Sequence, residues 1–319
     1  MPTNAFLLAL AAGLISAVVF ASATTGAMLL RVILFLLTPL SLYLAGLGLG
    51  VVAGAIAAIT ATALVMLIAN PLTAGAYAIS TALPAVICTR LTLMSRGPEE
   101  DREWYPIGRV VVTAAIFAGL FAMLALVLMG GSIETLTKIL RGAVENFVKS
   151  ELSQIPGAPD IGAAEIDEIT HSTLATLPWA LGLLGMTTTL FNLWLAGRIT
   201  LASGRLVRPW PDLSQFKLPA GATFMLMVAI GLTFAGGMTG LLAACIAAPF
   251  TLAFALVGLA LVHVLTRGSR WQTLILSSLY SGAIFIPHIS LLLALAGLAE
   301  TVFGYRTAGK PPPPPNSET

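Results

Sequence analysis

Most of the chain is apolar, and the few polar side chains inside its apolar runs are the ones that could contact a ligand. Arg31 lies near the start of the second run, where a charge costs about 2.5–3.5 kcal/mol at the bilayer centre and less near its surface. It is either an interfacial arginine that reaches water or an anchor for an anionic group arriving from outside. Thr188 and Asn192 are four residues apart and share a helix face. They either join helices or line a ligand cavity.

His288 directly follows Pro287 inside the last apolar run. Helices broken at membrane depth free backbone groups and mark binding sites in transporters. His288 is therefore another candidate ligand contact, with a structural place at an outer turn as the alternative. Glu300 and Arg306 are six residues apart, and we expect them to pair or to cap neighbouring helices. The candidate substrate-binding residues are Arg31, Asn192, Thr188 and His288.

The chain lacks the short motifs of several enzyme classes. No segment matches the phosphate-binding G-x-x-x-x-G-K-[ST], the zinc-binding H-E-x-x-H or the nucleophilic G-x-S-x-G. The two cysteines, Cys88 and Cys245, lie in apolar runs without metal-ligand spacing. We therefore expect no enzymatic activity, no metal and no cofactor, and any transport would need an external source of energy.

Composition indicates that lipid surrounds most of the chain. Hydrophobic residues make up 57% and charged residues 9%, whereas a soluble domain carries about 25% charged residues. Apolar runs of about 20 residues cross a bilayer as helices. We therefore predict an all-α polytopic transmembrane bundle with about eight to ten spans. The apolar runs cover residues 5–25, 28–46, 48–69, 72–93, 107–130, 174–197, 219–238, 240–265 and 272–303.

Charged residues between the runs indicate the topology. Basic residues gather at 94–106, 198–218 and 266–271, which should therefore be cytoplasmic. The 131–171 connection carries three basic against seven acidic residues and should lie outside. Because four runs precede the first basic connection, we expect a cytoplasmic N-terminus.

Two segments need separate treatment. Between Ile133 and Leu152, apolar residues recur at helical spacing, which predicts an amphipathic helix with Ser132 as its N-cap. It lies along the outer interface or covers the bundle, or alternatively binds a partner. The run 272–303 is long for one span and short for two. We favour a hairpin at Pro287 over a single kinked span.

We divide the chain into two parts. Residues 1–306 are expected to form a single integral membrane domain, with 131–171 as its acidic extracytoplasmic loop. Residues 307–319 include five consecutive prolines and should be a disordered tail.

Small residues recur at every fourth position in two places. Such ladders allow close approach of helix backbones, a main route to association in lipid. They either meet each other within the chain or serve a partner. Their members are Ala5, Ala9, Gly13 and Ala17 in the first, and Gly46, Gly50 and Gly54 in the second.

The end of the chain resembles a known family. Leu292-Leu293-Ala294-Leu295-Ala296-Gly297-Leu298-Ala299-Glu300 and the following Phe303-Gly304-Tyr305-Arg306 resemble the end of the YybS-like (DUF2232) family of predicted bacterial membrane proteins. Leu37-Thr38-Pro39-Leu40 also fits. The resemblance implies a multi-pass protein of the bacterial inner membrane and no particular activity.

A weaker likeness concerns the first helix. Its small-residue face is similar to that of the substrate-binding S components of energy-coupling-factor transporters, where this face docks on a separate membrane coupling subunit. S components are smaller and lack a long acidic outer loop. The resemblance implies a coupling subunit as a partner.

Two functions follow as hypotheses. The first is a transport-related, non-enzymatic subunit that binds a small solute from outside and needs an energising partner. Its cavity would lie among the second run, the sixth run and the last pair of helices. The rival is a scaffold or assembly protein that holds other membrane proteins through its small-residue faces. Both place the chain in a lipid bilayer, and neither involves nucleic acid.

Overall fold

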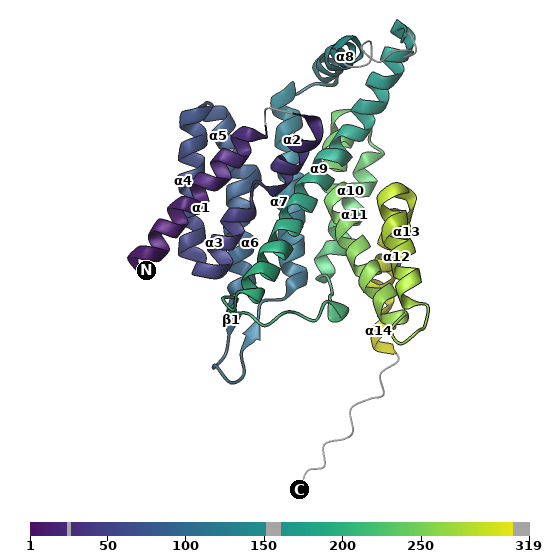
Figure 1. Cartoon of the computed structure of the whole chain (residues 1–319). Coiled ribbons are helices and arrows are strands. Elements are labelled where there is room, and N and C mark those ends of the chain that lie inside the picture. Colours follow the sequence, from purple (N-terminus) through teal and green to yellow (C-terminus); the bar gives the residue numbers. More distant parts are fainter. Residues whose placement is uncertain (24–26, 151–160, 309–319) are drawn as a thin grey trace.

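The computed structural model describes residues 1–23, 27–150 and 161–308, and this part of the chain is almost entirely helical (Figure 1). The first half contains α1 (Thr3–Ser22), α2 (Met28–Leu37), α3 (Leu40–Leu49), α4 (Val51–Ile68), α5 (Pro71–Tyr77), a π-helical turn (Ala78–Ala82) and α6 (Leu83–Leu93). A short hairpin of β1 (Ser95–Arg96) and β2 (Glu103–Trp104) follows. The remaining elements are α7 (Ile107–Met129), α8 (Ile133–Ser150), α9 (Ala163–Ala202), a 3-10 turn (Leu213–Gln215), α10 (Ala220–Thr233), α11 (Gly237–Leu265), α12 (Gln272–Phe285), α13 (Pro287–Phe303) and α14 (Tyr305–Ala308).

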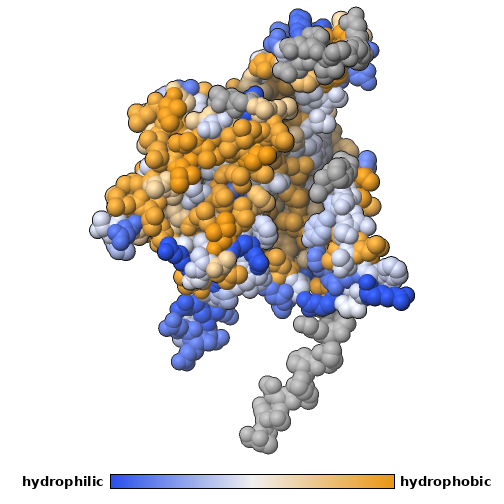
Figure 2. Space-filling model, viewed as in Figure 1, coloured by the Kyte–Doolittle hydropathy of each residue, from blue (hydrophilic) through white to orange (hydrophobic). Residues whose placement is uncertain are grey.

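The prediction of a polytopic helical membrane protein is confirmed. Within the described residues, seven helical segments are long and apolar enough to cross a bilayer, or up to eight if the bent pair α12 and α13 is one span. Figure 2 shows a broad apolar band with hydrophilic residues gathered at the two ends of the molecule. The predicted tail lies outside the described residues from residue 309 onward.

The basic connections meet at one end of the bundle. Figure 1 shows the β1–β2 hairpin, the connection between α9 and α10, and the turn between α11 and α12 at this end, with α8 at the opposite end. We call residues 94–106, 203–219 and 266–271 the basic end. Grouping the cationic residues at one end keeps them out of the apolar band.

The acidic connection contains the predicted amphipathic helix. Ser132 caps the N-terminus of α8 as expected, because its Oγ accepts from the Thr135 backbone N–H at 3.2 Å. Leu136 and Leu140 are buried on its apolar face, and Arg141 pairs with Asp167 at 2.8 Å to join α8 to α9. Leu152, the last residue of the predicted pattern, lies outside the described residues.

The small-residue ladders pack against helices of the same chain. A Cβ added to Gly13 would meet the backbone of Ala57 and Ala61, so α1 lies directly on α4. The second ladder is not a single ridge. Gly50 has φ +99° and ends α3, so Gly46 and Gly54 stand on two antiparallel helices that approach through these glycines. Ala9 and Ala17 are fully buried, while Ala5 is half-buried.

The last two long helices form a hairpin. The chain turns by 116° between α12 and α13, and α13 begins with Pro287, which lacks an N–H and suits the first turn of a helix. Arg306, just beyond α13, donates to the Ser214 carbonyl in the connection at the basic end. Because α12 also starts at that end, both ends of the hairpin lie there.

Candidate functional site

A groove runs between the helical bundle and α12 near the basic end. It has two overlapping chambers that share seven lining residues, among them Trp210, Leu256 and Tyr280. The inner chamber has a volume of about 550 Å³ and the outer chamber about 630 Å³. Small-molecule sites commonly fall between about 300 and 1,000 Å³. Figure 2 shows the surface hollowed beside the lobe formed by α12 and α13.

The inner chamber is walled by bulky apolar and aromatic side chains. Phe191 and Trp194 come from α9, and Trp210 comes from the connection between α9 and α10. The Trp210 ring lies against Gly197, where an added Cβ would come within 3.3 Å of it. Arg198 also lies over the Trp210 ring, with its guanidinium carbon 5.1 Å from the ring centre. Glycine on the helix thus leaves room for a large aromatic wall.

One cation lies in the wall of the inner chamber. Arg208 is only 7% exposed, and its Nη1 donates to the Thr92 carbonyl at 2.9 Å. Its guanidinium carbon also lies 5.7 Å from the Trp104 ring centre. Burial lowers the pKa of the Arg208 guanidinium, because removal from water disfavours the charged form. The hydroxyl of Thr92 is buried without a hydrogen-bond partner.

The outer chamber is more polar. His263 Nδ1 lies 2.9 Å from the Leu259 carbonyl, so this nitrogen carries the proton and donates. Its Nε2 is left to accept from the Tyr280 hydroxyl at 3.4 Å. Asp212 accepts from the Ser214 backbone N–H at 2.9 Å. Hydrogen bonds from Ser214 lower the pKa of the Asp212 carboxyl, with smaller contributions from Gln215 and Arg267.

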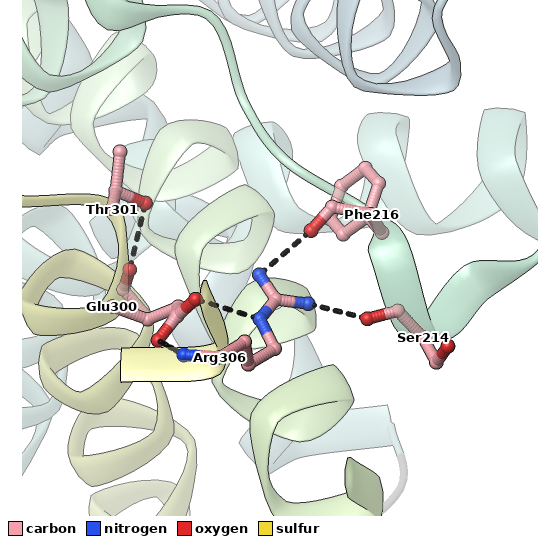
Figure 3. Close-up of polar contacts among 6 residues, drawn as sticks. Ser214, Phe216, Glu300, Thr301 and Arg306 are labelled. Atoms are coloured by element: carbon pink, nitrogen blue, oxygen red, sulfur yellow. Dashed lines mark hydrogen bonds and ion pairs between the residues drawn. The ribbon is translucent and has the colours of Figure 1, made fainter. Parts of the chain in front are cut away.

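The connection that forms the floor of the groove is held by a buried ion pair (Figure 3). Arg306 Nε donates to Glu300 Oε1 at 2.7 Å, and the two side chains are 6% and 1% exposed. Arg306 Nη1 and Nη2 donate to the carbonyls of Ser214 and Phe216 at 2.8 and 2.9 Å. The expected pairing of Glu300 with Arg306 is therefore present, and the arginine also fixes a segment some ninety residues earlier in the chain.

The structure brings two of the candidate substrate-binding residues together. Asn192 is fully buried, and its Nδ2 donates to the carbonyls of Thr188 and Leu36, each at 2.7 Å. Leu36 lies where α2 ends before Pro39, so Asn192 satisfies backbone freed at this break. Asn192 Oδ1 and Thr188 Oγ1 are buried without a partner. The hydrogen bond from Asn192 to Leu36 thus joins α9 to α2, and the oxygen atoms of the two side chains remain as unused acceptors.

The other two candidates lie apart from this pair. Arg31 is exposed near the start of α2. His288 is exposed at the start of α13, in the turn of the hairpin. Within the described part of the chain, no hydrogen bond or ion pair joins either of them to Asn192 or Thr188. Their role in binding stays a prediction.

The sequence did not reveal the groove, because its walls come from six helices and from the connections that follow α9 and α11. One signal was present in the sequence. Trp210 stands between Pro209 and Pro211, two residues after Arg208, in a connection otherwise interpreted only by its charge. Such a stiff aromatic segment is typical of an ordered connection. Among the described residues, no group of three or more His, Cys, Asp or Glu side chains could hold a metal ion.

Comparison with known proteins gives one match. A family model described as "Predicted membrane protein (DUF2232)" matches residues 14–301. The match includes Glu300 and both chambers' lining residues, and it ends five residues before Arg306. No curated protein and no solved structure matches the chain. The likeness of the first helix to S components therefore stays a prediction.

Proposed function

We propose a ligand-binding role for this chain, which belongs to the DUF2232 family of predicted membrane proteins. The ligand is a small molecule with an apolar or aromatic body, and it occupies the groove beside α12. The observation that carries the proposal is the inner chamber, about 550 Å³ in volume and lined by Phe191, Trp194 and Trp210. Largely apolar walls with a few polar groups are typical of small-molecule sites.

The surroundings of the groove support entry from the membrane. Trp194 and Phe191 are 48% and 36% exposed within the apolar band, so the chamber is open toward lipid. Across the groove stands α12, none of whose described side chains is buried. A molecule dissolved in the bilayer can therefore reach the chamber without crossing the tightly packed half of the bundle.

We further propose that binding serves transport and that the chain is not itself an enzyme. The absence of a nucleotide-binding motif from the sequence supports dependence on an external energising partner. The groove lies at the basic end and Arg31 lines neither chamber, so the groove favours access from the bilayer or from the basic side over entry beside Arg31. The scaffold alternative loses support, because the ladder residues Gly13, Gly46 and Gly54 face helices of the same chain.

The test fills the groove with a bulkier side chain. Leu256 lies on α11 and lines both chambers, so Leu256→Trp should occupy the space that a ligand needs. The matched control is Leu265→Trp on the same helix, at a residue that is 72% exposed. Protein purified in mild detergent would be analysed by native mass spectrometry for bound small molecules and by thermal unfolding with membrane-soluble metabolites.

We expect ligand-dependent stabilisation of the wild-type protein and of Leu265→Trp, and its loss in Leu256→Trp. Stabilisation by a ligand present at about 100 times its Kd amounts to about 2.7 kcal/mol, which is readily measured. If the wild-type protein neither carries nor responds to any small molecule, the proposal is wrong. Equal responses of the two tryptophan variants would place binding outside the groove.

A further inference from the structure

Arg208 is a buried cation that lacks a carboxylate partner among the described residues. The residue is 7% exposed, and none of the ion pairs in the described part of the chain includes it. A guanidinium has five N–H donors, and the hydrogen bond to the Thr92 carbonyl uses one of them. An unpaired buried charge costs several kcal/mol, so this side chain favours a counter-ion.

A purely structural role accounts for part of this arrangement. Thr92 lies in the last turn of α6, where carbonyls lack helical partners and cations are favoured. Arg208 therefore caps α6, and its contact with Trp104 adds a cation–π interaction. Neither contact supplies negative charge, and neither engages the donors that remain.

The neighbouring groups strengthen the case for an anion. Asp212 lies four residues further along the connection, but its carboxylate engages Ser214 and Gln215 and interacts with Arg267. The Thr92 hydroxyl is buried, has no hydrogen-bond partner and lines the same chamber as Arg208. A buried hydroxyl without a partner destabilises the folded protein, because its lost hydrogen bonds to water are not replaced. The chamber thus presents a cation and a free hydroxyl side by side.

We propose that Arg208 and Thr92 bind an anionic group, a carboxylate or a phosphate, at one end of an apolar ligand whose body lies against Trp194 and Trp210. The inference rests on the proposed function and adds the chemical class of the ligand. Guanidinium groups bind both anions through paired, charge-assisted hydrogen bonds. An apolar chain with one anionic end matches the composition of the chamber, whose lining is aliphatic or aromatic apart from the polar groups of Arg208, Thr92 and Tyr280.

The test compares probes of equal length that differ in their head group. The full-length protein, in nanodiscs of phosphatidylcholine, would be titrated with dodecyl phosphate, dodecanoate and dodecanol, with binding followed by tryptophan fluorescence. Inorganic phosphate, alone and as a competitor, distinguishes a site for a free anion from a site for an amphipath. The variants are Arg208→Gln and Thr92→Val. Arg198→Gln is the matched control, because Arg198 contacts Trp210 but does not line either chamber.

We expect wild-type protein and Arg198→Gln to bind the two anionic probes at least about tenfold more tightly than dodecanol. In Arg208→Gln this preference should fall to about twofold or less while dodecanol binding persists, and Thr92→Val should reduce it partly. Inorganic phosphate should compete only weakly, because it lacks the apolar body.

Several outcomes would overturn the inference. Equal affinity of the wild-type protein for dodecanol and the anionic probes would reject the anionic class while leaving the proposed groove function intact. Full retention of the preference for anionic probes in Arg208→Gln would mean that the anionic group binds elsewhere. Failure of all three probes to bind would count against the proposed function itself. Because the wild-type comparison needs no variant, the inference stays testable if Arg208→Gln does not fold.

Discussion

α13 packs closely on α11, whereas α12, the other arm of the same hairpin, buries none of its described side chains. On α13, Leu293, Ala294 and Glu300 are at most 8% exposed. A Cβ on Gly297 would overlap the Phe254 carbonyl, so the two backbones touch there. α12 contacts α11 through the His263–Tyr280 pair and stands across the groove.

The difference shows how residue size decides where a membrane bundle is solid and where it is hollow. Small residues on α13 let the backbones approach, and dispersion contacts then hold the helices together in lipid. Bulky side chains line the space that remains on the other side, such as Tyr280 on α12, Trp194 on α9 and Trp210 in the connection after α9. One arm of the hairpin is thus an anchor and the other a wall of the groove.

The largest effect should follow from enlarging Gly297, the glycine at which α13 touches the backbone of α11. Gly297→Ala places a methyl group against the backbone of α11, and we expect it to lower the free energy of unfolding by about 3 kcal/mol or more. Unfolding in detergent would measure this change. Gly231→Ala on α10 is the matched control, because nothing lies within 4 Å of an added Cβ there. A neutral result for Gly297→Ala would contradict the close packing of α13 on α11.

Breaking the buried ion pair should come next. Arg306→Gln leaves Glu300 charged and buried without its cationic partner, which we expect to cost about 3 kcal/mol of unfolding free energy. Arg306→Lys should not restore stability, because a single ammonium group cannot reproduce the fork that contacts Glu300, Ser214 and Phe216. In contrast, Arg96→Gln removes an exposed pair and should cost less than about 1 kcal/mol. Similar losses of unfolding free energy in Arg306→Gln and Arg96→Gln would mean that burial of the ion pair does not increase its contribution to stability.

Hydrogen exchange should separate the two arms without any mutation. None of the described side chains of α12 is buried, so its amides should open more readily than those of α13, which packs on α11. We expect at least about tenfold faster exchange in α12, equivalent to about 1.4 kcal/mol in opening free energy. Exchange followed by mass spectrometry on the protein in nanodiscs would measure it. Equal protection of the arms would remove the distinction between anchor and wall.

The smallest effect should be that of the hydroxyl on α12. Tyr280 is 46% exposed, and its 3.4 Å contact with His263 is long, so Tyr280→Phe should change stability by less than about 0.5 kcal/mol. Tyr77→Phe is the contrasting variant. The Tyr77 hydroxyl lies 2.6 Å from Ser16 Oγ and is buried, so its loss should cost about 1–2 kcal/mol. A greater loss in Tyr280→Phe than in Tyr77→Phe would reverse the comparison.

Much of the fold could be predicted because it depends on local pattern. Long apolar runs must form helices in lipid to satisfy their backbone groups. The helical spacing of apolar residues from Ile133 to Ser150 is likewise enough to predict α8. The pairing of Glu300 with Arg306 was also foreseeable, since a reach of six residues is local. The extent of α9 was not, because its polar first turns before residue 174 fall outside the apolar run.

The candidate site shows where prediction from sequence ends. Arg31, Asn192 and His288 stood out because each is polar in an apolar run, yet the structure gives Asn192 a helix-joining contact with Leu36 and leaves the other two exposed. The groove depends on which helices lie side by side. Apart from Trp210 between two prolines, it has no signature along the chain, because Thr92, Arg208 and Tyr280 are each ordinary in their own segments.

The sequence by itself determined that this protein is a helical membrane bundle with its basic connections grouped and its acidic connection apart. Those properties follow from hydropathy, helical period and charge, which act over a few residues at a time. Only the tertiary structure decided that the second ladder packs Gly46 on Gly54, that residues 272–303 turn back on themselves, and that Arg208 lies buried in a groove. Such features arise from contacts between residues far apart in the chain, where packing geometry and burial set the energy.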